Sequence, residues 1–155
     1  MDMYEISEKL KAQFSGLIVV NAWGEKSFFY NPDGLLKHGV YFCTLKEKDG
    51  ANDKASNLNR EGLFRLNFGI SKSSFLKLFA VLSKRPAQGQ VINGAYDFTA
   101  LDILTPHPVY GWMAWVSIVN PTEHSWGVLQ ELLFESYELV LKKYKVKKLS
   151  QEMLS

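Results

Sequence analysis

Two short segments of the chain carry the side chains best suited to chemistry. His107 lies between Pro106 and Pro108, and Tyr110 follows shortly after. Proline has a fixed φ, and a residue that precedes a proline is held in an extended conformation. A rigid extended segment can present an imidazole as an acid, a base or a ligand. It can equally form a structural corner, and the local sequence leaves both interpretations open.

The second segment is an alternating stretch in which Arg65 and Asn67 share the polar side. A guanidinium offers a planar fork of donors that matches a carboxylate or a phosphate. Alternatively, Arg65 pairs with a local acidic residue and Asn67 ties down a loop. We predict that His107 and Tyr110 line a surface cleft with Arg65 or Asn67 nearby. These four residues are therefore the candidate ligand-binding residues, and no catalytic residue is assigned.

Metal binding and covalent catalysis have little support in the pattern of ligand-type residues. The three histidines, His38, His107 and His124, are not spaced as metal ligands are. Asp53, together with Asn57 and Asn59, does not match the spacing of a calcium-binding loop. Cys43 lies within an apolar strand, where a small buried residue is expected. We predict no metal and no cofactor.

The charge of the chain argues only weakly for a nucleic-acid partner. The net charge is +2, and the densest basic cluster lies near the C-terminus, at Lys142, Lys143, Lys145, Lys147 and Lys148. Such a cluster attracts phosphates, but lysines at a helix C-terminus also complement the helix dipole. We therefore expect weak, salt-sensitive nucleic-acid binding at most.

Length and composition indicate a cytoplasmic protein. The chain has 155 residues and one cysteine, so it cannot form an internal disulfide. Its first residues lack the basic and apolar regions of a secretory signal, and its apolar runs are too short to span a bilayer. We expect a single domain over residues 1–148 and a frayed tail over residues 149–155.

The elements that must position these side chains follow from periodicity and caps. Apolar spacing predicts helices over residues 2–14, after Ser71 and from Asn120 onward. Asp2, Ser71 and Asn120 are the expected N-caps. β-Branched and alternating stretches predict strands at residues 17–20, 27–30, 40–47, 63–70 and 112–119.

Two apolar surfaces stand out among these elements. Residues 63–70 alternate, so one face is expected to be buried and the other at least partly solvated. The last helix carries the longest apolar stripe. We predict that these surfaces meet, with Phe64, Leu66 and Phe68 packed against Trp126, Leu129 and Leu133. Residues 48–62 hold few large apolar side chains and are expected to form an exposed loop.

The order of helices and strands predicts an α+β fold. An antiparallel β-sheet would be covered on one face by the N-terminal and C-terminal helices.

Several motifs resemble a bacterial family that is known only as a domain of unknown function. The resemblance runs from about Val19 to Lys142, and its central motif is the stretch Gly62–Ser71. The other motifs are Ala100-Leu101-Asp102, Pro106-His107-Pro108-Val109-Tyr110, Trp115-Val116, Asn120-Pro121 and Ser136-Tyr137-Glu138-Leu139. This resemblance implies no established catalytic residues.

The end of the chain is more remotely similar to the MmcQ/YjbR-like group. In that group a Trp-bearing strand leads into a helix with an element like Ser136–Val140. The resemblance implies a CyaY-like α+β fold and the DNA-binding role that has been proposed for that group.

Our first hypothesis is a non-catalytic binding or interaction domain, because no catalytic constellation is recognised and aromatic residues are abundant. A small-molecule-binding domain or small enzyme with a cleft near His107 is the first alternative. Weak nucleic-acid binding is the second.

Overall fold

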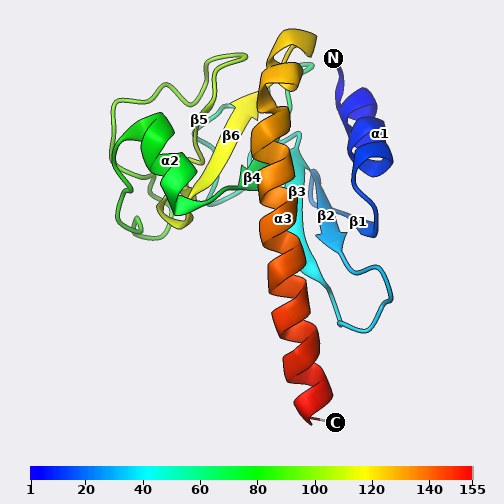
Figure 1. The fold of residues 1–155 in the computed structure, drawn as a ribbon. Helices are drawn as coiled ribbons and strands as arrows, with labels where there is room; N and C mark the ends of the chain where they lie inside the picture. Colours follow the sequence, from blue (N-terminus) through cyan, green and yellow to red (C-terminus); the bar gives the residue numbers. More distant parts are fainter. Residues whose placement is uncertain (155) are drawn as a thin grey trace.

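A six-stranded antiparallel sheet forms the centre of the α+β fold, with a helix near each end of the chain (Figure 1). The computed structural model describes residues 1–154. The strands are β1 (Leu17–Ala22), β2 (Glu25–Tyr30), β3 (Val40–Lys46), β4 (Arg65–Gly69), β5 (Thr105–Pro106) and β6 (Trp115–Val119). They are arranged in the order β1-β2-β3-β4-β6-β5, and every neighbouring pair is antiparallel.

The helices are α1 (Met3–Gln13), α2 (Lys72–Phe79) and α3 (Glu123–Leu154), with a short 3-10 turn, η1, at Gly111–Met113. In Figure 1, α3 runs across the sheet and its C-terminal half projects beyond the strands. No helix in the described part of the chain is long and apolar enough to cross a membrane.

The predicted packing between β4 and α3 is confirmed. Leu66, Phe68, Leu129 and Leu133 belong to one buried cluster, which also contains Phe64 and Trp126. Residues of α1 join the same cluster, so both terminal helices cover this face of the sheet. The alternation of β4 therefore identified the core face correctly.

The opposite face of the sheet is not solvated as predicted. Arg65 and Asn67 are each only 1% exposed. Residues 48–62, expected to form an exposed loop, lie over this face, with Ser56 and Leu58 buried. A loop with few large apolar residues can still cover a sheet when its polar groups find partners there.

Two of the three predicted helix caps are confirmed. The Asp2 carboxylate accepts the Glu5 backbone N–H at 2.8 Å, and Ser71 Oγ accepts that of Ser74 at 3.0 Å. Both caps satisfy donors that the first turn of a helix leaves without intrahelical partners.

The third cap, Asn120, was predicted wrongly. Asn120 has φ +46° and bonds instead to the residues just before β4, accepting from the Phe64 N–H at 2.9 Å and donating to the Gly62 carbonyl at 3.0 Å. Thr122 caps α3, because its Oγ1 accepts the Ser125 N–H at 3.2 Å. An amide side chain satisfies either a helix end or a strand end, and here the long-range partner prevails.

Helix α3 continues past the expected end of the domain at residue 148. Lys148 Nζ donates to Asp33 at 2.8 Å, and Gln151 donates to the Leu35 carbonyl at 2.7 Å. The loop between β2 and β3 therefore contacts the last turns of the helix. The predicted tail, residues 149–155, is helical as far as Leu154, and Ser155 lies outside the described residues.

Candidate functional site

Polar side chains form two rows across the face of the sheet that lies opposite α3. Strand pairing aligns Thr44 of β3, Asn67 of β4, Ser117 of β6 and Thr105 of β5 in one row. A second row aligns Glu25, Lys46 and Arg65 across β2, β3 and β4. Since neighbours on one face of a sheet lie about 5 Å apart, each row places side chains within hydrogen-bonding reach.

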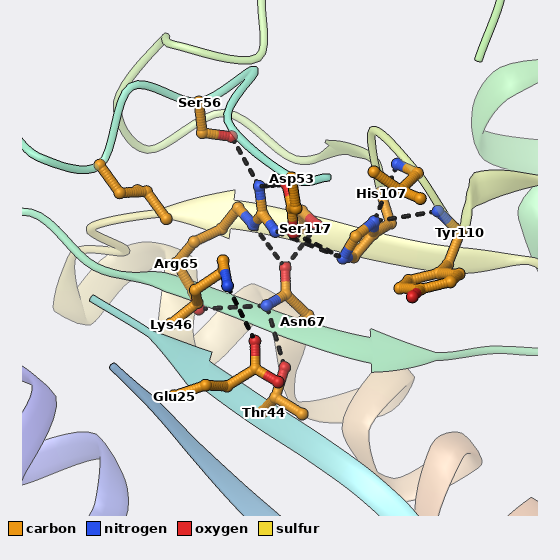
Figure 2. Close-up of polar contacts among 12 residues, drawn as sticks. Glu25, Thr44, Lys46, Asp53, Ser56, Arg65, Asn67, His107, Tyr110 and Ser117 are labelled. Atoms are coloured by element: carbon orange, nitrogen blue, oxygen red, sulfur yellow. Dashed lines mark hydrogen bonds and ion pairs between the residues drawn. The ribbon is translucent and has the colours of Figure 1, made fainter. Parts of the chain in front are cut away.

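Arg65 is the centre of this polar layer (Figure 2). Its Nε donates to Asn67 Oδ1 at 2.7 Å, and its Nη1 donates to Asp53 Oδ1 at 3.1 Å and to Ser56 Oγ at 2.9 Å. Its Nη2 forms an ion pair with Asp53 Oδ2. The donor fork of Arg65 is thus occupied by residues of the loop 48–62, which it holds against the sheet.

Asp53 is the carboxylate that balances this buried guanidinium. Burial opposes its ionisation, but the hydrogen bonds and charge of Arg65 outweigh burial and lower the pKa of Asp53. The carboxylate therefore remains ionised around neutral pH and keeps the loop paired to β4.

Asn67 connects three strands. Its Oδ1 accepts from Arg65 and from Ser117 Oγ at 2.6 Å, and its Nδ2 donates to Thr44 Oγ1 at 3.0 Å. All of these partners are on the sheet, so Asn67 does not tie down a loop as the alternative interpretation proposed.

His107 turns the chain between β5 and η1. Its Nδ1 accepts the backbone N–H groups of Val109 and Tyr110, each at 3.0 Å. A nitrogen that accepts two donors must carry a lone pair, so Nε2 holds the proton of the neutral ring. Nε2 lies 3.3 Å from Arg65 Nη2 and 3.8 Å from Asp53 Oδ2.

Burial strongly disfavours the charged form of His107. Burial, together with the nearby charge of Arg65, lowers the pKa of His107 to about 3, although Asp53 acts in the opposite direction. The ring is neutral around pH 7, and its lone pair is engaged by the backbone. This arrangement suits a structural corner and a hydrogen-bond donor better than a general base.

Beside this corner the sheet face opens into a cavity of about 280 Å³. Its lining combines aromatic and thioether side chains with several polar ones. The lining residues are Glu25, Tyr41, Thr44, Asp53, His107, Tyr110, Met113 and Trp115. Apolar walls with a few convergent polar groups are typical of small-molecule sites.

The four residues predicted from the sequence therefore meet in one region, but in different roles. His107 and Tyr110 line the cavity, with their rings 5.0 Å apart. Arg65 and Asn67 do not line it and lie in the neighbouring polar network. His107 is only 3% exposed, so it is a buried side chain at the cavity wall.

Sequence reasoning missed Asp53 as the partner of Arg65, and it missed Glu25, Tyr41 and Thr44 altogether. Asp53 was considered only with loop residues as a cation site. One usable signal was present: Thr44 and Lys46 alternate in the third strand as Arg65 and Asn67 do in the fourth. Such matching polar alternation favours neighbouring strands whose polar faces coincide.

A larger hollow, of about 700 Å³, lies near the start of α1 and the residues before β4. It is lined mainly by exposed loop residues such as Arg60 and Glu61. The polar layer does not reach it, so the smaller cavity is the better candidate.

The other candidate groups are placed less favourably for chemistry. Cys43 is fully buried, and burial raises the pKa of its thiol well above the ordinary value. Among residues 1–154 there is no group of three histidine, cysteine or acidic side chains placed to hold a metal ion. Of the C-terminal lysines, Lys148 pairs with Asp33.

The lowered pKa of His107 predicts a loss of stability in acid. His107 binds a proton below about pH 6.5 in the unfolded chain, but only below about pH 3 in the folded chain. The free energy of unfolding therefore decreases as the pH is lowered through this window. In His107→Asn, the amide oxygen can still accept the Val109 and Tyr110 N–H groups, but it does not titrate. Urea unfolding between about pH 6 and pH 4 gives the slope of the free energy of unfolding against pH. For His107→Asn this slope should be smaller than for the unchanged protein by up to about 1.4 kcal/mol per pH unit.

His38→Asn is the matched control, because His38 is exposed. It should retain the slope of the unchanged protein. Equal slopes for His107→Asn and the unchanged protein would show that His107 is charged in the folded state.

Comparison with other proteins identifies the family of this chain. Searches of the curated proteins and of the solved structures each found no match. One family model spans nearly the whole chain, including every strand and all residues of the cavity. By this match over residues 1–149, the chain belongs to the family of unknown function DUF6194.

Proposed function

We propose that this protein is a non-catalytic binding protein that takes a small organic molecule in the cavity beside His107. The observation that carries the proposal is the cavity itself, where aromatic walls meet the edge of a buried polar layer. Its volume of about 280 Å³ is at the lower end for small-molecule sites, so a compact ligand is expected.

Rigidity of the cavity supports binding. Two main-chain hydrogen bonds to His107 hold the backbone that carries Tyr110, and the Phe29 ring, 4.2 Å from that of Tyr41, supports this second lining residue. A preformed site loses little conformational freedom when a ligand enters.

The hydrogen bonds of Arg65, Asn67 and His107 favour a binding role over a catalytic role for these three side chains. Arg65 and Asn67 use their donors on neighbouring side chains, and the His107 lone pair is engaged by the backbone. A general base or nucleophile needs a lone pair directed at the substrate. These three side chains instead support the shape of the site.

Three probes of one size and different charge test the site: benzyl alcohol, benzylamine and benzoate. In ¹H–¹⁵N NMR titrations at least one probe should shift the amides of Tyr41, Thr44 and Trp115. The shifts should be lost in Tyr110→Ala, which removes one wall. Tyr110 is 49% exposed, so this variant is expected to fold.

Tyr4→Ala is the matched control, because Tyr4 is 69% exposed on α1 and does not line the cavity. It should leave the shifts unchanged. If none of the probes shifts these amides, the proposal is wrong.

A further inference from the structure

The charges on the cavity wall all have one sign. Among the eight lining residues, Glu25 and Asp53 are acidic and none is lysine or arginine. His107, the remaining titratable base, is neutral around pH 7. A ligand in the cavity therefore meets two carboxylates and no cationic side chain on the surface that it contacts.

The cations that balance these carboxylates lie behind the wall. Lys46 Nζ is 3.6 Å from Glu25 Oε2, and Lys46 is 8% exposed. Arg65 is 1% exposed and pairs with Asp53. The side chains of Glu25 and Asp53 keep 32% and 16% of their surface exposed, and they line the cavity while Lys46 and Arg65 do not.

Aromatic side chains supply the rest of the wall. Tyr41 projects from β3, Trp115 from the start of β6, and Tyr110 from the turn before η1. The thioether of Met113 completes this set. The face of an aromatic ring is electronegative, and several rings around one cavity attract a poorly hydrated cation.

Other ligand classes fit this wall less well. An anion would lie against Glu25 and Asp53 and be repelled by them. A neutral hydrocarbon would pack well against the rings. It would also remove water from both carboxylates without offering them a hydrogen bond or a charge in its place. A cation with an apolar surface stabilises the rings and the carboxylates together.

We infer that the cavity binds a small organic cation of the alkylated-ammonium type, held between Tyr41, Tyr110 and Trp115 and attracted by the nearby carboxylates of Glu25 and Asp53. The inference rests on the proposed function, since it names the ligand class of the same cavity. An ammonium that carries methyl groups has a weak hydration shell, so it moves from water to an aromatic site at small cost.

Choline and its uncharged analogue 3,3-dimethylbutan-1-ol test this inference directly, because they differ in charge and hardly in shape. In NMR titrations choline should shift the amides of Tyr41, Thr44 and Trp115. It should bind about tenfold more tightly than the alcohol.

Two variants separate the contribution of charge from that of the rings. Glu25→Gln should weaken the binding of choline by about three- to tenfold and leave the binding of the alcohol unchanged. Glu131→Gln, at an exposed position of α3, should change neither affinity. Tyr110→Leu keeps an apolar wall without a π face, so it should weaken the binding of choline more than the binding of the alcohol.

The outcomes distinguish the inference from the proposed function. If the alcohol binds as tightly as choline, or if benzyl alcohol or benzoate shifts the cavity amides more strongly than benzylamine and choline do, the cation inference is wrong and the binding function stands. If none of these probes shifts the amides, both are wrong.

Discussion

Arg65→Ala should lower the free energy of unfolding by about 3–5 kcal/mol, because it leaves a largely buried carboxylate without its partner. Asp53, Ser56 and Asn67 all lose donors in this variant, and Arg65 itself is only 1% exposed. The residual exposure of Asp53 gives water some access and places the expected value in the lower half of that range. Urea unfolding at about pH 7 measures the loss.

Asp53→Ala and the double variant complete the experiment. If the two side chains act as a pair, the double variant should lose less stability than the sum of the single losses. Arg85→Ala is the matched control: Arg85 is exposed, and its guanidinium lies 5.2 Å from the centre of the Trp112 ring. It should cost at most about 1 kcal/mol. Additive single losses would show that the guanidinium and the carboxylate do not stabilise one another.

Leu133→Ala is expected to cost about 2–5 kcal/mol, from lost burial and from the cavity left behind. Leu133 is fully buried in the cluster that joins α3 to Leu66 and Phe68 of β4. Leu149→Ala is the matched control, since it makes the same change at a 52% exposed position of the same helix. Calorimetry should show a clear drop in Tm for Leu133→Ala and little change for Leu149→Ala. A retained Tm at Leu133 would contradict the packing of α3 against β4.

Local signals in the sequence were sufficient for most helices and strands. The alternation of residues 63–70 identified the core face, and the apolar stripe of the last helix identified its partner. Asp2 and Ser71 were recognisable as caps because a cap bonds to a backbone N–H only three residues away. Interactions of short range leave a pattern in consecutive residues, and that pattern can be read directly.

Asn120 is a residue for which the local sequence pattern predicted the wrong partner. Its position before Pro121 is typical of a cap, yet its amide bonds to Gly62 and Phe64, more than fifty positions earlier. A backbone group at the helix end and one beside the distant strand satisfy the amide equally well in chemical terms. Which of them it meets depends on how β4 and β6 pair, and this pairing is not encoded near either residue.

For the candidate site too, local sequence predicted some features and long-range contacts decided others. The sequence by itself predicted His107, Tyr110, Arg65 and Asn67 as candidate ligand-binding residues, because their chemistry and their local constraints are properties of single segments. Only the tertiary structure decided that His107 and Tyr110 line the cavity while Arg65 and Asn67 lie in the polar network beside it. Strand register aligned Glu25, Lys46 and Arg65, and the folding of loop 48–62 over the sheet placed Asp53 beside Arg65. Burial and charge then determined the protonation of His107, because both depend on what surrounds the ring and not on the residues next to it in the chain.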